Sequence, residues 1–348
     1  MTSSIVTEKK IETAPITKKD FESDQDVRWC PGCGDYAILA QVQRLLPDLG
    51  IPRENLVFIS GIGCSSRFPY YMDTFGFHTI HGRAPAIATG LKSSRPELSV
   101  WVITGDGDGL SIGGNHLIHL LRRNIDLNIL LFNNRIYGLT KGQYSPTSEI
   151  GKITKTTPLG SLDHPFNPIA LALGAEATFV ARTLDRDLKH LAETLRQAND
   201  HKGCSFVEIY QNCNIFNDKA FIQFTEKESK PFNTVSLEHE QPLIYADGTK
   251  GIRLNGFKLE SVDLEPGEER DDLLVYDQHC DDPTLASIVA RISDTKELPL
   301  PVGVFRDVSR PCYEDGLNQQ LENAREKMGS GDLDDLLHMG DTWVVPSK

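Results

Sequence analysis

The 348-residue sequence lacks the features of several large classes of protein. No apolar run is long enough for a transmembrane helix, and residues 1–21 lack the apolar stretch of a secretory signal. Positive charge is also scarce, because 36 Lys and Arg residues stand against 49 Asp and Glu residues, for a net charge of −13. We therefore expect a cytoplasmic protein whose main partner is neither nucleic acid nor a membrane.

Two binding motifs are missing as well. No Gly-x-Gly-x-x-Gly fingerprint of a dinucleotide site lies between a predicted strand and a predicted helix. The ferredoxin-type run Cys-x-x-Cys-x-x-Cys-x-x-x-Cys-Pro is absent too. Seven cysteines are present, and in a cytoplasmic protein they are not expected to form a disulfide framework.

The most informative stretch runs from Leu98 to Tyr137. An apolar run over 100–103 stops at Gly-Asp-Gly-Asp-Gly, and a second over 129–132 stops at Asn-Asn. The helical pattern between them places one set of residues on a single side: Ile112, His116, Leu117, Leu120 and Leu121. A strand–helix–strand crossover makes the two strands parallel, so both carboxyl ends lie at the edge where open α/β sheets bind ligands.

Asp106 and Asn134 follow these two strand ends. The glycines around Asp106 let backbone N–H groups approach a phosphate closely. Oxygen ligands beside a phosphate cradle suit Mg²⁺. The alternative is a glycine-rich turn at the start of a polar helix, and the paired asparagines make that alternative less favoured.

Strand and helix patterns alternate over most of the chain. Strands are expected at 56–59, 177–181 and 205–210, and helices at 84–92, 167–174 and 187–199, the last with Leu188, Leu191 and Leu195 facing inward. This alternation predicts an α/β fold with a mainly parallel, doubly wound sheet and an irregular C-terminal extension. We expect a flexible arm over 1–25, a ligand-binding domain over 26–220, and an extension over 221–348 ending in one or two polar helices.

Four of the cysteines fall where strand ends are predicted to converge. Cys30 and Cys33 form a Cys-x-x-Cys pair before a helix, and Cys64 and Cys213 each follow a predicted strand. A redox pair would use only the first two thiols, whereas a zinc site or an iron–sulfur cluster would use all four. The residues alone favour the cluster only slightly.

Several motifs together resemble the β subunit of 2-oxoacid:ferredoxin oxidoreductases. In order they are Trp-Cys-Pro-Gly-Cys-Gly, Gly-Ile-Gly-Cys-Ser-Ser-Arg, His-Gly-Arg-Ala, Gly-Asp-Gly-Asp and Asn-Asn-x-Ile-Tyr-Gly-Leu-Thr-Lys-Gly-Gln. The resemblance covers Trp29 to Asp218. It implies a [4Fe–4S] cluster on Cys30, Cys33, Cys64 and Cys213. Cys204, Cys280 and Cys312 are left without a role.

The same resemblance implies a thiamine diphosphate site. Mg²⁺ would be held by Asp106, Asn134 and the backbone carbonyl of Ile136. The residues expected to line the cofactor are Gly63, Cys64, His81, Gly105, Asp106, Gly107, Asp108, Asn134, Ile136, Gly138, Leu139 and Thr140. Arg67 and Lys141 are candidates for contacting the substrate.

The implied reaction is the coenzyme A-dependent oxidative decarboxylation of a 2-oxoacid, with electrons passing through the cluster to ferredoxin. The glutamate that activates thiamine comes from a companion α subunit in this family, so we expect an αβ pair or its dimer as the functional unit. We favour 2-oxoglutarate over pyruvate as the substrate. A non-oxidative thiamine-dependent decarboxylase or carboligase subunit and a zinc-stabilised scaffold subunit remain as alternatives.

Overall fold

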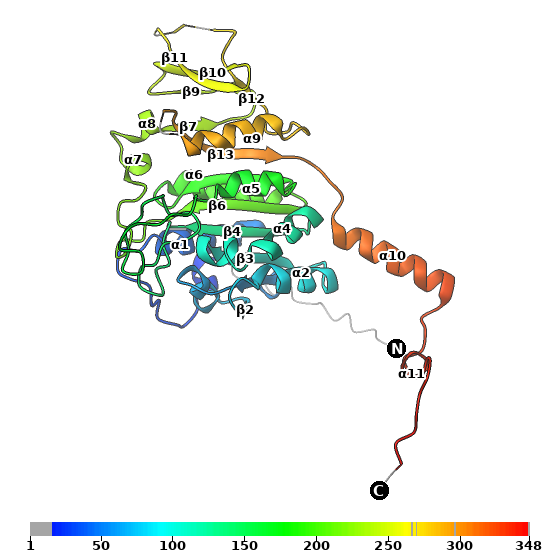
Figure 1. Cartoon of the computed structure of the whole chain (residues 1–348). Coiled ribbons are helices and arrows are strands. Elements are labelled where there is room, and N and C mark those ends of the chain that lie inside the picture. Colours follow the sequence, from blue (N-terminus) through cyan, green and yellow to red (C-terminus); the bar gives the residue numbers. More distant parts are fainter. Residues whose placement is uncertain (1–15, 266, 269, 296, 347–348) are drawn as a thin grey trace, which may run out of the picture.

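The computed structural model describes residues 16–265, 267–268, 270–295 and 297–346. Its centre is an eight-stranded sheet, whose strands stack from β2 to β7 in Figure 1. In spatial order the strands are β2 (Phe75–His78), β1 (Leu56–Ser60), β3 (Ser99–Gly105), β4 (Leu127–Asn133), β6 (Cys204–Tyr210), β5 (Phe179–Leu184), β13 (Leu300–Asp307) and β7 (Thr234–Leu237). All neighbouring pairs are parallel except β13 with β5. The predicted mainly parallel sheet is confirmed.

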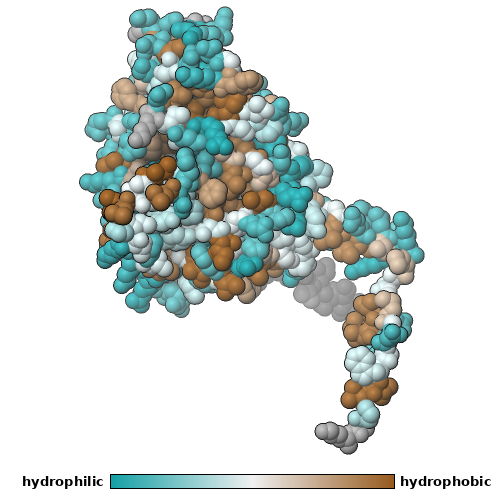
Figure 2. All heavy atoms as spheres, in the orientation of Figure 1, coloured by the Kyte–Doolittle hydropathy of each residue, from teal (hydrophilic) through white to brown (hydrophobic). Residues whose placement is uncertain are grey.

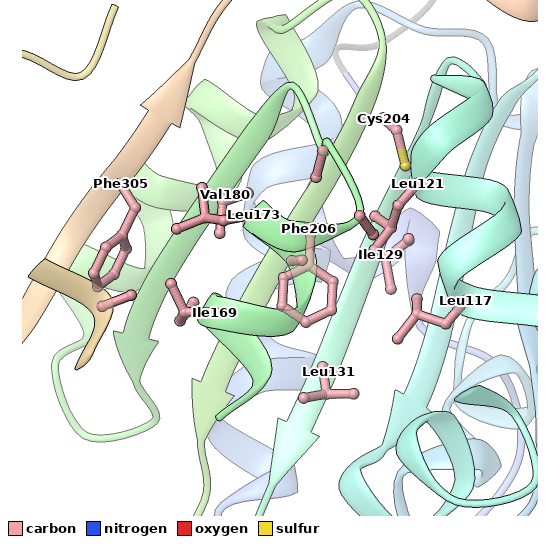
Figure 3. Close-up of a cluster of buried hydrophobic side chains, with 14 of the residues drawn as sticks. Leu117, Leu121, Ile129, Leu131, Ile169, Leu173, Val180, Cys204, Phe206 and Phe305 are labelled. Atoms are coloured by element: carbon pink, nitrogen blue, oxygen red, sulfur yellow. The ribbon is translucent and has the colours of Figure 1, made fainter. Parts of the chain in front are cut away.

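Helices cover both faces of this sheet, as a doubly wound fold requires. The helices packed around the sheet are α1 (Asp35–Leu45), α2 (Ala84–Ser94), α4 (Gly114–Arg123), α5 (Pro168–Gly174), α6 (Leu188–Asp200) and α9 (Thr284–Ala290). Side chains of α2, α4, α5 and α9 share one buried cluster, and those of α1 and α6 share another. Figure 3 shows part of the first cluster, where Leu117 and Leu121 of α4 lie beside Ile129 and Leu131 of β4.

Successive residues of the central strands alternate between the two clusters. Ile129 and Leu131 belong to one cluster, while Leu130 and Phe132 belong to the other. All seven residues of β4 are buried, because a parallel strand with helices on both faces has no solvent-facing side. This explains why the strands appear in the sequence as unbroken apolar runs.

Two side-chain placements expected from the helical pattern are wrong. Leu188 is 43% exposed, because it opens α6, where no preceding turn covers it. Ile112 is 55% exposed, because α4 begins only at Gly114 and Ile112 lies in the turn before it. The remaining leucines of both patterns, from Leu117 to Leu195, are buried.

The sheet continues beyond residue 220, since β7 and β13 complete its far edge. Two short helices, α7 (Ile222–Thr225) and α8 (Lys230–Asn233), precede β7. The short strands between β7 and β13 are β8 (Gln241–Pro242), β9 (Ile244–Tyr245), β10 (Lys250–Asn255), β11 (Lys258–Asp263) and β12 (Val275–Tyr276). They build a three-stranded and a two-stranded sheet beside the main one. The proposed division into three domains stays a prediction, but the main sheet itself crosses the boundary at 220.

The two ends of the described chain differ. Near the start, Phe21 at the end of the 3₁₀ helix Lys18–Phe21 is fully buried, so this part of the expected flexible arm is packed against the core; residues 1–15 lie outside the described part. At the other end, α10 (Tyr313–Met328) and α11 (Leu333–Leu337) confirm the predicted polar helices and extend away from the body (Figure 1). Figure 2 shows apolar residues along this extension, where Trp343 is 84% exposed. Within the described residues, no helix combines the length and apolar character needed to span a membrane.

Candidate active site at the carboxyl edge of the sheet

A cavity of about 560 Å³ lies where the carboxyl ends of β1, β3 and β4 meet, and we call it the cofactor cavity. Every residue predicted to line the cofactor, from Gly63 to Thr140, is on its wall. The wall also contains residues that sequence reasoning missed: Ile62, Ser65, Tyr137 and Gln143. Each of them lies within three positions of a predicted residue, so the quoted motifs could have located them.

Asp106 begins the short helix α3 (Asp106–Leu110) directly after β3 and is 2% exposed. Its Oδ2 atom accepts hydrogen bonds from Ser145 Oγ at 2.5 Å and from Thr147 Oγ1 at 2.6 Å. Burial raises the pKa of the Asp106 carboxyl group, and these hydroxyl donors oppose the rise. The loop that follows β4 thus holds one oxygen of the Asp106 carboxylate in place.

The two asparagines at the end of β4 have different surroundings. Asn133 points away from the cavity, donating to Glu208 Oε1 at 2.7 Å. Asn134 is on the cavity wall, and its Nδ2 donates to Gln211 Oε1 at 2.9 Å. Glu208 in turn forms a buried ion pair with Arg182, with 2.7 Å between Glu208 Oε2 and Arg182 Nε. The buried charge next to Asn133 is therefore paired. Only the second asparagine is available to the cavity, as the predicted Mg²⁺ ligand set requires.

Asp108 is an anchor for the surrounding loops. Its Oδ1 accepts from the backbone N–H of Ile62 at 3.0 Å and of Gly82 at 2.7 Å, and lies 2.7 Å from His81 Nδ1. Its Oδ2 accepts from Thr104 Oγ1 at 2.6 Å. Both oxygens are therefore engaged within the protein, and the side chain holds the walls of the cavity together.

Glycine is required at two places by close packing. A Cβ atom on Gly107 would lie 2.2 Å from the Tyr137 ring, whose hydroxyl donates to the Gly107 carbonyl at 3.0 Å. A Cβ atom on Gly61 would lie 1.9 Å from Asp108 Oδ2. Neither space admits a side chain, so these glycines allow the backbone and the site to approach closely.

A second cavity of about 300 Å³ adjoins the first, and we call it the cysteine cavity. Its wall includes Cys30, Cys33, Cys64 and Cys213, brought together from three loops as predicted. Both cavities share one set of residues: Cys64, Asn134, Gly138 and Leu139. A Cβ atom on Gly138 would lie 3.6 Å from the sulfurs of both Cys64 and Cys213, so a side chain at this position would contact both thiols.

The other cysteines lie elsewhere. Cys204 is the first residue of β6 and is fully buried in the core. It is separated from Cys213 by the length of this strand, roughly 20 Å at about 3.3 Å per residue. Cys312 is buried at the start of α10, Cys280 is half-buried, and none of the cysteines forms a disulfide.

The cysteine cavity disfavours negative charge. Burial, followed by the nearby Asp35 carboxyl, raises the pKa of Cys33, and the same causes raise the pKa of Cys64 to about 12. Burial also raises the pKa of Asp35 to about 7, and neither of its oxygens has a hydrogen-bond partner among the described residues. A metal ligand must be a thiolate, so bound iron would have to offset this resistance to negative charge at Cys33 and Cys64.

The four thiols line one cavity, and such a set of ligands suits an iron–sulfur cluster. Across the described ranges, no three His, Cys, Asp or Glu side chains are spaced to hold one metal ion. In a four-iron cluster each thiolate binds a different iron, so the sulfurs surround a volume instead of a point. The wall of the cysteine cavity includes four thiols, the number that such a cluster would use.

Comparisons with known proteins identify the family of this chain. Residues 61–209 match the family model for the thiamine pyrophosphate enzyme, C-terminal TPP binding domain. The 2-oxoglutarate oxidoreductase subunit KorB of Mycobacterium tuberculosis is 58% identical over 95% of this chain and 89% of its own length. The chain belongs to the family of 2-oxoacid:ferredoxin oxidoreductase beta subunits. It is therefore a subunit of an oxidoreductase.

Two further members of this family show how far the likeness extends. The 2-oxoacid:ferredoxin oxidoreductase 1, subunit beta, of Aeropyrum pernix is 47% identical over 56% of this chain and 62% of its own length. A solved structure, 2-oxoglutarate:ferredoxin oxidoreductase from Magnetococcus marinus with 2-oxoglutarate, coenzyme A and succinyl-CoA bound, is 33% identical with a TM-score of 0.72. That match covers 95% of this chain and 98% of the other.

In this beta subunit the two candidate substrate residues lie on the wall of the cysteine cavity and not of the cofactor cavity. Arg67 is half-buried and donates to the backbone carbonyl of Arg28 at 2.9 Å. Lys141 is exposed and has a positive φ of 74°, with its backbone N–H donating to the Gly138 carbonyl. Both are close to the junction of the cavities, since Gly138 and Leu139 belong to both walls.

Proposed function

We propose that this beta subunit binds thiamine diphosphate, Mg²⁺ and a [4Fe–4S] cluster, and takes part in the oxidative decarboxylation of 2-oxoglutarate. One molecule of 2-oxoglutarate and one of coenzyme A give succinyl-CoA, CO₂ and one proton, and two electrons leave through the cluster to two molecules of ferredoxin. The main support is the adjoining pair of cavities, one lined by oxygen ligands and glycines, the other by four thiols. A non-oxidative thiamine enzyme has no use for four thiols beside its cofactor.

The chain's own residues would position the cofactor. Asp106, Asn134 and the carbonyl of Ile136 are all on the cavity wall and would hold Mg²⁺ against the diphosphate. Bound thiamine diphosphate supplies the electron sink that lets CO₂ leave the 2-oxoacid. The loop carrying Ser145 and Thr147 keeps the Asp106 carboxylate in place while this happens.

The cysteine cavity would accept the electrons. Cys30, Cys33, Cys64 and Cys213 would hold the cluster next to the cofactor, because Cys64 belongs to both walls. A cluster supplies single-electron steps that a thiamine cofactor alone lacks. Arg67 and Lys141 would offer positive charge to the substrate carboxylates at the junction of the cavities.

The partner of this subunit would be an α chain carrying the activating glutamate. In the described part of the chain, the wall of the cofactor cavity contains Asp106 and Asp108 but no glutamate. We therefore propose an αβ pair or its dimer as the active unit, and a cytoplasmic location. Isolated beta subunit, given thiamine diphosphate and Mg²⁺, should not decarboxylate 2-oxoglutarate.

The test is to purify the chain with its natural partner and measure iron, sulfide and thiamine per αβ pair. Turnover of 2-oxoglutarate and of pyruvate is then compared, with coenzyme A and oxidised ferredoxin present. Faster turnover of pyruvate would replace 2-oxoglutarate as the substrate. Thiamine without iron would favour the non-oxidative enzyme, and zinc without iron the scaffold subunit.

A further inference from the structure

We propose that Gln211 is a positioning residue that joins the Mg²⁺ site to the iron–sulfur cluster. This inference rests on the proposed function, because it assigns Gln211 a role toward both groups. Gln211 follows β6 directly, and its backbone N–H donates to the Asn133 carbonyl at 3.0 Å. It is 1% exposed and on the wall of the cysteine cavity, between the two sites.

The Gln211 side chain contacts one predicted ligand of each group. Its Oε1 accepts from Asn134 Nδ2 at 2.9 Å. Its Nε2 donates to Cys33 Sγ at 3.2 Å and to the Asn212 carbonyl at 2.8 Å. The two ends of one amide group are thereby used for two different sites, so its orientation is fixed by contacts on both.

The contact with Asn134 determines which amide atom of that residue is available. Because Asn134 Nδ2 donates to Gln211, its Oδ1 is directed to the other side, where it accepts from the Ile136 N–H at 3.2 Å. A carbonyl oxygen has two lone pairs, so one remains for Mg²⁺. Outer contacts of this kind orient a metal ligand and change metal affinity.

The contact with Cys33 acts on the cluster. An N–H group pointing at a thiolate sulfur favours the reduced state, because it stabilises the added negative charge, and such hydrogen bonds are among the factors that set cluster potentials. Cys33 is otherwise in surroundings that oppose negative charge, since it is buried beside Asp35. By donating to Cys33 Sγ, Gln211 would therefore make the cluster a better electron acceptor.

Two substitutions separate these effects. Gln211→Glu keeps an acceptor for Asn134 but removes the N–H donor to Cys33, whereas Gln211→Met keeps the size and removes both contacts. Asn214→Leu is the matched control, because Asn214 is on the same cavity wall and its Nδ2 donates to the Pro31 carbonyl, while among the described residues it makes no hydrogen bond to a sulfur or to Asn134. All variants are purified as the αβ complex and checked for iron content.

The readouts are the cluster midpoint potential, from a redox titration followed by electron paramagnetic resonance, and the Mg²⁺-dependent affinity for thiamine diphosphate. Both glutamine variants should make the cluster roughly tenfold harder to reduce, a fall of about 59 mV for one electron. Thiamine diphosphate affinity should drop about tenfold in Gln211→Met only, in line with the loss of an outer metal-ligand contact. The titrations are run at pH 7 and pH 9, so that the introduced glutamate is ionised in at least one of them.

The proposed role of Gln211 is refuted if Gln211→Met retains its iron but keeps either the wild-type cluster potential or the wild-type affinity for thiamine diphosphate. It is also refuted if Asn214→Leu shifts both readouts equally, since the effect would then belong to the loop. If the wild-type complex contains no iron or no thiamine, the proposed function is refuted, and the role of Gln211 that rests on it is refuted as well.

Discussion

The two cavities lie side by side at one edge of the sheet but are constructed differently. In the cofactor cavity, Asp106 and Asp108 each accept hydrogen bonds from the chain, and glycines lie where a side chain would clash with its neighbours. In the cysteine cavity, the Asp35 carboxyl group and the side-chain amide oxygen of Asn214 have no hydrogen-bond partner within the described residues, and burial raises the pKa of the Cys33 and Cys64 thiols. The first site is organised by hydrogen bonds within the chain, whereas the second leaves buried polar groups without partners.

This difference predicts that the two sites can be disrupted independently. The largest effect should come from Asp106→Ala, which removes the single carboxylate expected to hold Mg²⁺ and also leaves two hydroxyl groups without their acceptor. We expect thiamine diphosphate to be lost on purification while iron remains at the wild-type level. Cofactor and iron are measured on the same sample, with the exposed Asp163→Ala as control. Unchanged thiamine binding would remove Asp106 from the metal site.

The reverse experiment uses the cysteines. Cys213→Ser should lose the cluster and keep thiamine diphosphate, because Cys213 is on the wall of the cysteine cavity only. Cys204→Ser should retain both cofactors, since Cys204 is buried at the opposite end of β6. Iron and sulfide analysis of the two variants gives the answer. Loss of iron in Cys204→Ser with iron kept in Cys213→Ser would mean that the fourth ligand is misassigned.

The strand ends were predictable, and the contacts between loops were not. Unbroken apolar runs mark β3 and β4, and parallel topology then places Asp106 and Asn134 at one edge, as the structure has them. The hydrogen bonds from Ser145 and Thr147 to Asp106 come from a loop about forty positions away with no periodic pattern. Only the folded path of that loop brings its hydroxyls back to β3.

The same reason applies to β13 and to Gln211. The apolar residues of β13 are visible in the sequence, but its antiparallel pairing with β5 depends on how the chain returns from the small sheets. Gln211 follows a predicted strand without belonging to any motif, so nothing in the sequence links it to Cys33, from which it is separated by most of the main domain. Local patterns determine where elements end, and tertiary packing determines which side chains meet there.

A glycine substitution tests how tightly the cofactor cavity is organised. Gly107→Ala would place a methyl group 2.2 Å from the Tyr137 ring, and overpacking of this kind costs about 1–3 kcal/mol of unfolding free energy. Gly114→Ala is the matched control, because its Cβ atom would meet nothing within 4 Å and alanine favours the helix. Thermal unfolding of both should show a lower Tm for Gly107→Ala only. An equal Tm in the two variants would mean that the Tyr137 ring moves freely.

The smallest expected effect comes from Lys141→Ala, which tests whether the substrate contacts the wall of the cysteine cavity. Lys141 is exposed on that wall, beside residues that both cavities share. If its ammonium group binds the distal carboxylate of 2-oxoglutarate, Lys141→Ala removes a charged contact of about 1.5 kcal/mol, or roughly a tenfold loss in kcat/KM.

Pyruvate has no distal carboxylate, so its kcat/KM should stay the same, and Lys155→Ala in another exposed loop should affect neither substrate. Alanine keeps the Cβ atom, so the strain of the positive φ at this position does not change between the two proteins. An equal loss on both substrates would assign Lys141 to the carboxylate they have in common, and the junction of the cavities would then serve the reacting end of the substrate instead of its tail.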